Sequence, residues 1–221
     1  PGLNTGRLSY EQFFTDVNVQ IRASLEYAHY RRMNWLCDQE MGLPESWGLF
    51  PDVQNCYDAT WAGCPLHFMG ASLPDTEPIL LRKEVLYDLP EELPVFGGLV
   101  ERGREFFEQM HDWCRAGREF HGRPVQPPRR TSGEGTDGVL ELAFKLRGVE
   151  NALVDMMEDP DYFQDLCAYI TRNVIRRLHG IRKWRWEHYP EVSDDKGCLQ
   201  GGFYFADDAI ALISTRSYRE Q

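Results

Sequence analysis

A long amphipathic helix towards the carboxyl end restricts the folds that are open to this chain. Asp159, Pro160 and Asp161 are typical of a helix start, because an aspartate can cap the first turn and proline fits the first helical position. Apolar residues then recur every three or four positions, which predicts one buried face. Arginines and lysines accumulate towards the helix end and indicate a solvated face, because cations favour a helix C-terminus. The apolar positions are Phe163, Leu166, Ile170, Val174, Leu178, Ile181 and Trp184.

The segment after this helix indicates a strand, an acidic loop and another helix start. Residues 201–214 read GGFYFADDAIALIS, so Asp207 and Asp208 follow an apolar run that begins after two glycines. Strands that alternate with long helices are typical of βαβ units, which form parallel sheets. We therefore expect an α/β fold.

Three further helices are expected upstream. Residues 9–39 contain no proline or glycine and repeat apolar residues at helical spacing, and Ser9 suits the N-cap. Residues 98–116 show the same spacing along one side. Residues 139–146 are apolar and precede Gly148, which suits a helix end.

Residues 42–94 differ in composition from the predicted helices. Prolines recur throughout this range and exclude a long helix. A short helix is expected near residues 53–62, followed by a hairpin that bends at Gly70 or at Pro74-Asp75. No internal repeat or interdomain linker interrupts the chain, so we expect a single domain.

Composition excludes several classes of protein. The formal net charge of −11 is unsuited to a nucleic-acid-binding surface. The chain does not start with a signal-peptide pattern, and no apolar run approaches the roughly 18 residues of a membrane span. These features predict a cytoplasmic protein that binds a small molecule, neither nucleic acid nor a membrane. The six cysteines are scattered and are expected to be reduced: Cys37, Cys56, Cys64, Cys114, Cys167 and Cys198.

Asp207 and Asp208 are the first candidates for chemistry. Carboxylates just beyond a strand end lie where parallel α/β folds build their sites. Adjacent residues of a strand point to opposite faces, so at most one of the two is expected to face a ligand. The alternative interpretation is an N-cap for a helix that begins near Ala209.

Two further acids are candidates. Thr136 and Asp137 lie in a glycine-containing loop, where the backbone can approach a ligand closely, although either residue can instead cap the next helix. The loop lacks the Gly-Lys-Ser/Thr of a phosphate-binding P-loop. Asp52 follows another apolar run, and its alternative interpretation is a turn residue or cap.

Evidence for a metal site or a familiar catalytic motif is weak. Cys56, Cys64 and His67 have donor atoms suited to zinc, but their spacing matches no zinc signature. The chain contains no G-x-S-x-G, G-x-G-x-x-G or H-E-x-x-H sequence. No bound metal or cofactor is expected from these residues.

Three segments resemble the uroporphyrinogen decarboxylase superfamily. They are GTDGVLELAFKLRGVENALVDMMEDPDYFQDLCAYITRNVIRRL, GGFYFADDAIALISTRSYRE and FPDVQNCYDATWAGCPLHF, and the similarity spans roughly residues 42–220. The resemblance implies a (β/α)8 TIM barrel with its pocket at the carboxyl ends of the strands. It also implies that residues 1–41 form an N-terminal helical segment and residues 42–221 about the first half of the barrel. A half barrel leaves a sheet edge uncovered, so a homodimer is expected.

The resemblance implies one of two chemistries. The first is decarboxylation of a tetrapyrrole or a related carboxylated small molecule without a cofactor. The alternative is methyl transfer that depends on zinc and on a corrinoid protein as partner, with zinc ligands expected beyond residue 221. A third hypothesis is a ligand-binding barrel without catalysis.

Site residues follow from the resemblance position by position. Asp52 lies in Phe-Pro-Asp-Val, which is similar to the phrase that holds the decarboxylases' key aspartate, and it is expected to be catalytic together with Asp207 and Asp208. Asp208 stands where the decarboxylases have serine, and Phe144 where they have a pocket tyrosine. Their N-terminal arginine pair has no clear counterpart, so a polycarboxylate would be repelled. The expected substrate-binding residues are Thr136, Asp137, Phe144 and Tyr204.

Overall fold

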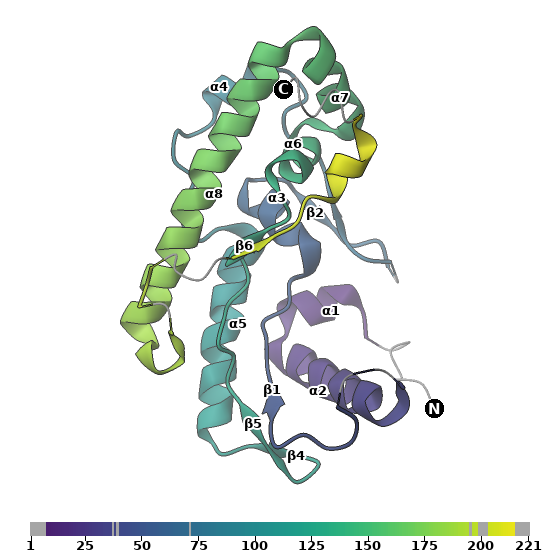
Figure 1. The fold of residues 1–221 in the computed structure, drawn as a ribbon, viewed down its shortest axis with the longest axis vertical. Helices are drawn as coiled ribbons and strands as arrows, with labels where there is room; N and C mark the ends of the chain where they lie inside the picture. The colour runs from purple at the N-terminus through teal and green to yellow at the C-terminus, as the bar shows by residue number, and fades with distance from the viewer. Residues whose placement is uncertain are drawn as a thin grey trace. The chain divides into compact units, whose positions relative to one another are not determined.

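A computed structural model describes residues 8–36, 38, 40–70, 72–194, 196–198 and 203–214. Figure 1 shows the helices and strands in chain order. The chain divides into two compact units. The first comprises Pro1–Val53, Phe68–Pro74 and Arg102–Ser132, and the second comprises Gln54–His67, Asp75–Glu101 and Gly133–Gln221.

In the first unit, two helices stand where one was predicted. Helix α1 (Tyr10–Thr15) begins at Ser9, whose side chain forms a reciprocal capping box with Gln12 and confirms the predicted N-cap. Helix α2 (Val17–Asn34) is separate because Asp16 has an extended backbone and its side chain caps the amide of Asn18. The prediction of one helix over residues 9–39 was therefore wrong at Asp16, since a good capping residue replaced the helical turn there.

A small sheet completes the first unit. Its strand order is β1 (Trp47–Gly48), β5 (Arg123–Gln126) and β4 (Glu119–Phe120), with β1 parallel and β4 antiparallel to β5. Helix α5 (Gly98–Arg115) confirms the predicted helix, and its residues from Arg102 onwards belong to this unit. The core lies between these elements and contains Ile21, Leu25, Trp47, Leu49, Met110 and Val125.

The second unit begins with short elements. A 3-10 turn η2 (Gln54–Cys56) and helix α3 (Tyr57–Trp61) confirm the predicted short helix. Strands β2 (Leu66–His67) and β3 (Asp75–Thr76) pair antiparallel, which confirms the predicted hairpin. Helix α4 (Val85–Asp88) follows.

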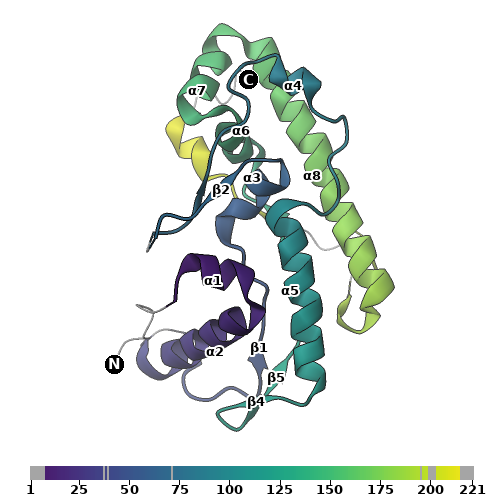
Figure 2. The same ribbon diagram turned by 180° about the vertical axis from the view of Figure 1, so that it is seen from behind.

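Three helices then pack together in the second unit. They are α6 (Val139–Arg147), α7 (Val149–Glu158) and α8 (Pro160–His188), and α8 lies against both others, as both views show (Figures 1 and 2). Asp159 caps α8 through the amide of Tyr162, as predicted. Helix α7 was not predicted; Gly148, at φ +85°, separates it from α6. A 3-10 turn η3 (Pro190–Val192) follows α8.

A parallel strand pair joins the two ends of this helical segment. Strand β6 (Gly135–Thr136) precedes α6, and strand β7 (Tyr204–Phe205) follows η3 and precedes the 3-10 turn η4 (Asp208–Leu212). The two strands pair in parallel, with Gly135 opposite Tyr204 and Thr136 opposite Phe205. The predicted βαβ connection is thus present.

The described residues form a mixed helical and stranded protein, as the α/β prediction states. Helix predominates, and the strands form three separate small sheets. No closed barrel is present in the part of the chain that the structure describes. Nor does any helix in that part have both the length and the apolar character that a membrane span requires.

Candidate functional site

The candidate site lies at the carboxyl ends of β6 and β7. Because the two strands are parallel, Asp137 after β6 and Asp207 after β7 leave the sheet at the same edge. The amide of Ala206 donates to the carbonyl of Thr136 at 3.1 Å and extends the pairing by one residue. Ligands of open α/β sheets bind outside this edge. The structure thus brings together four of the predicted site residues: Thr136, Asp137, Tyr204 and Asp207.

A buried ion pair supports β6 from two helices. Asp58 on α3 is 3% exposed, and Arg177 on α8 is fully buried. Asp58 Oδ1 lies 2.5 Å from Arg177 Nη1. The guanidinium also lies over the ring of Trp61, with 4.3 Å to the centroid, and donates to the carbonyl of Gly135 at 2.7 Å. The guanidinium therefore replaces its lost hydration with one carboxylate, one carbonyl and the faces of two aromatic rings, Trp61 and Tyr57.

Asp58 also fixes the loop after β6. Its Oδ2 accepts hydrogen bonds from the hydroxyl of Thr136 at 2.9 Å and from the amide of Asp137 at 2.8 Å. The Thr136 hydroxyl oxygen in turn accepts from the amide of Gly138 at 3.2 Å. The alternative in which Thr136 or Asp137 caps the next helix is not observed, since α6 has Gly138 at its N-cap and no side-chain cap.

Asp137 has the most perturbed carboxyl group of the site. Burial, followed by the charges of Asp58 and Glu141, raises its pKa to about 7, while Arg177 and a hydrogen bond from Tyr57 oppose the rise. Burial and the neighbouring Asp58 raise the pKa of Tyr57, so its hydroxyl stays protonated. A carboxyl group that titrates near neutral pH can both deliver and take up a proton under physiological conditions.

Asp207 contacts the start of α6. Its Oδ2 accepts from the amide of Leu140 at 3.1 Å, and its Oδ1 is buried with no hydrogen-bond partner among the described residues. Burial raises the pKa of Asp207, and the charge of Asp208 adds to the rise, against the amides of Leu140 and Glu141. The alternative N-cap role is not observed, because Asp207 precedes η4 without capping it.

Gly138 permits this contact. It has φ +108°, and a Cβ atom there would lie 2.4 Å from the carbonyl oxygen of Ala206 and 2.5 Å from Asp207 Oδ2. A glycine is therefore required for the loop after β6 to approach the loop after β7.

The remaining predicted residues differ in exposure. Asp208 is exposed and Tyr204 is 63% exposed, so both are open to solvent. Phe144 is 3% exposed and packs in the hydrophobic core of the second unit. Its contacts are those of a core side chain because position 144 lies on the inner face of α6.

Asp52 belongs to the first unit. Its amide donates to Gln20 Oε1 at 3.0 Å, and its carbonyl accepts from Gln20 Nε2 at 2.7 Å. Gln20 is fully buried on α2 and so holds the backbone at Asp52. The catalytic role that the resemblance implies for Asp52 stays a prediction.

Tyr57, Asp58 and Arg177 were not predicted from the sequence as site residues. The solvated-face interpretation of the α8 cations was wrong for Arg177, Arg182 and Arg185, which are 0%, 3% and 1% exposed. The sequence held one indication that Arg177 is buried: it is the neighbour in sequence of Leu178, which was predicted to lie on the buried face of the helix. Arg185 instead pairs with buried Glu134, whose Oε2 lies 3.0 Å from its Nη2.

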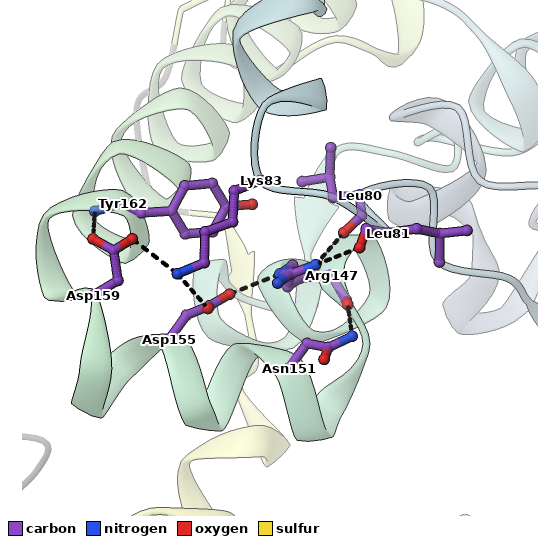
Figure 3. Close-up of polar contacts among 8 residues, drawn as sticks. All are labelled: Leu80, Leu81, Lys83, Arg147, Asn151, Asp155, Asp159 and Tyr162. Carbon is purple, nitrogen blue, oxygen red and sulfur yellow. Dashed lines mark hydrogen bonds and ion pairs between the residues drawn. The ribbon is translucent and has the colours of Figure 1, made fainter.

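A second buried network lies elsewhere in the same unit (Figure 3). Arg147 Nε donates to Asp155 Oδ2 at 2.7 Å, and its Nη1 donates to the carbonyls of Leu80 and Leu81 at 2.6 and 3.0 Å. Lys83 Nζ bridges Asp155 and Asp159 at 2.9 and 2.8 Å. This network joins the segment before α4 to α6, α7 and the start of α8. These contacts hold the elements together, which accounts for the network as structural support.

The described residues offer no metal centre. No group of three or more histidine, cysteine, aspartate or glutamate side chains in the described ranges is placed to hold a metal ion. Burial raises the pKa of Cys64 to about 11, so it is a thiol at neutral pH. His67 Nε2 instead lies 3.3 Å from Glu77 Oε1. The methyl-transfer hypothesis stays a prediction, because the resemblance places its zinc ligands beyond residue 221.

Comparisons with protein-family models, with curated proteins and with solved structures found no match to this chain. The family resemblance therefore remains a prediction.

Proposed function

We propose that the chain belongs to an enzyme of the uroporphyrinogen decarboxylase type, which removes carbon dioxide from a small carboxylated molecule without a cofactor. In this proposal the pocket lies at the carboxyl ends of β6 and β7, within a (β/α)8 barrel to which residues 42–221 contribute. One observation carries the proposal: Asp137 follows β6 at the same end of the sheet where Asp207 follows β7, and its pKa is raised to about 7, chiefly by burial.

Decarboxylation makes a specific demand on such a site. The bond between the substrate carbon and its carboxylate breaks, carbon dioxide leaves, and the electron pair stays on the carbon. A proton must then form the new C–H bond. Protonated Asp137 is the group of this site that can supply it near neutral pH, and solvent restores the proton afterwards.

The other groups of the site suit binding. Asp207 Oδ1 has no hydrogen-bond partner among the described residues, so it can accept a bond from a substrate N–H or O–H. Exposed Tyr204 offers an aromatic face on β7. Asp208 keeps the catalytic role expected from the sequence, and Thr136 positions the loop that carries Asp137. The catalytic role that the resemblance implies for Asp52, which lies in the first unit, is a separate prediction.

The test is a carbon dioxide release assay with uroporphyrinogen and with smaller carboxylated pyrroles. Asp137→Asn keeps the shape of the side chain but removes the acid, and we expect turnover to fall by about 10²–10⁴-fold. Asp112→Asn is the control, because Asp112 lies on the surface of the other unit in a pair with Arg115 whose side chains are both 69% exposed.

Wild-type turnover in Asp137→Asn would refute the proton-donor assignment. An Asp52→Asn variant tests the residue that the resemblance favours, and a large loss there would show that Asp52 also takes part. Specific binding without product in any assay would support the non-catalytic hypothesis instead. Stoichiometric zinc together with methyl transfer would support the methyltransferase hypothesis.

A further inference from the structure

The Asp58–Arg177 pair has no role in the proton transfer itself, yet it is the most deeply buried ion pair of the site. Removing two charges from water is costly, and a buried pair is by itself weak evidence for stability. Both residues reach β6 from elements that are remote in sequence, Asp58 from α3 and Arg177 from α8. Their placement therefore calls for an explanation in terms of what they contact.

The contacts fall on successive residues of β6 and its loop. Arg177 Nη2 donates to the Gly135 carbonyl, and Asp58 Oδ2 accepts from the Thr136 hydroxyl and from the Asp137 amide. The backbone is thus held on both sides of the position that carries the Asp137 carboxyl group. Tyr57, next to Asp58 on α3, donates to that carboxyl group.

We propose that Asp58 and Arg177 form a positioning pair, which holds the Asp137 carboxyl group at the carboxyl end of β6 and regulates when it carries a proton. The inference rests on the proposed function only for the use that the enzyme makes of that proton. Its structural part concerns Asp137 alone.

The two partners act on Asp137 in opposite directions. The negative charge of Asp58 opposes ionisation of Asp137, and the positive charge of Arg177 favours it, with the effect of Asp58 the larger of the two. Because Asp58 also neutralises Arg177, the pair leaves a net preference for the protonated carboxyl group. The groups that face Asp137 from the surrounding elements are Cys56 on η2, Tyr57 and Asp58 on α3, Glu141 on α6 and Arg177 on α8.

The test is a pH titration of the chain labelled with ¹³C at the aspartate carboxyl carbons, read by NMR without substrate. The Asp137 signal is assigned by its loss in Asp137→Asn. In Asp58→Asn we expect the proton affinity of Asp137 to fall by about tenfold or more, because a like charge disappears and Arg177 is released. In Arg177→Met we expect it to rise.

The matched control is Asp155→Asn. It removes the acid from another deeply buried arginine pair of the same unit, in the network of Figure 3, but Asp155 is not among the groups that act on Asp137. A purely structural role for Asp58 predicts that both variants lower the melting temperature and that neither moves the Asp137 titration. The proposal predicts that only Asp58→Asn moves it.

A double variant keeps the proposal testable if the single variants fail to fold. Asp58→Asn/Arg177→Met replaces the pair with neutral groups, which buried sites tolerate better than one unpaired charge. We expect its Asp137 affinity for protons to fall, but less than in Asp58→Asn. An unchanged or increased affinity in this variant would overturn the proposal, as would equal shifts in Asp58→Asn and Asp155→Asn.

The titration also separates this inference from the proposed function. If wild-type protein decarboxylates nothing but the Asp137 titration shifts with the expected signs, the proposed reaction fails and the positioning pair stands. If the enzyme is active and the Asp137 titration does not shift in the variants, the proposed reaction stands and the proposal of a positioning pair is refuted. When both hold, the pH profile of kcat in Asp58→Asn should move towards lower pH with the Asp137 titration.

Discussion

At the scale of single residues, position in the fold separates acids that look alike in the sequence. Asp137 and Asp208 each follow a short strand, yet Asp137 is half-buried beside the charge of Asp58, and Asp208 is exposed. Burial is what raises the pKa of Asp137 most. Both residues are candidates from the sequence, and only the tertiary surroundings show that Asp137 suits proton exchange near neutral pH.

Gly138 gives a prediction at this scale. In Gly138→Ala the new Cβ atom would lie 2.4 Å from the Ala206 carbonyl oxygen and 2.5 Å from Asp207 Oδ2, well inside van der Waals contact, in addition to the strain of a positive φ. We expect the free energy of unfolding to fall by at least about 2 kcal/mol, measured by urea denaturation. The Asp207 contact to α6 should be lost with it.

Gly148→Ala is the matched control for this prediction. Gly148 also has a positive φ, +85°, but the nearest atom to a Cβ there is Pro78 Cγ at 3.6 Å, an ordinary contact. Its substitution should show the cost of the backbone strain alone. Equal losses in the two variants would mean that the close approach of the two loops does not matter for stability.

At the scale of secondary-structure elements, some features of α8 could be predicted from the sequence and others could not. Its start at Asp159-Pro160 and its apolar face are confirmed, because capping and periodicity are local properties. Its buried arginines were mistaken for surface residues. Their partners Asp58 and Glu134 are far away in the sequence, so no local pattern could reveal them.

The network in Figure 3 gives a prediction for the contact between helices. Asp155→Asn leaves the guanidinium of Arg147 without its buried carboxylate, and Arg147 is only 8% exposed. Breaking such a pair costs about 3–5 kcal/mol, so we expect the free energy of unfolding to fall by roughly that amount in chemical denaturation. Lys83→Met should cost less, since the Lys83 side chain is 33% exposed. A larger loss in Lys83→Met would refute this ranking of the contacts.

At the scale of the whole molecule, the chain consists of two compact units that combine helices with short strands. The prediction of an α/β protein is confirmed at this level, including one parallel βαβ connection through α6, α7 and α8. The (β/α)8 barrel, the homodimer and the cytoplasmic location stay predictions. These strands are so short that their pairing depends on segments far away in the sequence. The residues around each strand therefore do not predict its partner.

The stability of the protein should depend on pH through Asp137. Its pKa is raised to about 7 in the folded state, against about 3.9 in an unfolded chain. Between these values the folded state binds more protons than the unfolded state, so this group's contribution to stability is full below about pH 4 and is lost as the pH rises through 7.

The difference between wild type and Asp137→Asn isolates this contribution. We expect the melting temperature of wild type, relative to the variant, to decline between pH 4 and pH 7 and then to level off. Circular dichroism at a series of pH values measures it. A difference that is constant over this range would show that the folded state does not raise the pKa of Asp137.

The sequence by itself determined the features that depend on neighbouring residues. These include the capped starts at Ser9 and Asp159, the helix ended by Gly148, the hairpin between β2 and β3, and the acids that follow the strand at Tyr204. Capping, periodicity and turn preferences act over a few residues, so they can be recognised without the fold.

Only the tertiary structure decided which of these acids matter and what surrounds them. It brought Asp58 and Arg177 to β6, placed Asp137 and Asp207 at one sheet edge, and buried Phe144 in the core. Burial and charge contacts depend on segments that meet only after folding, and these are the quantities that set a pKa. The chemistry of the site is therefore a property of the folded chain.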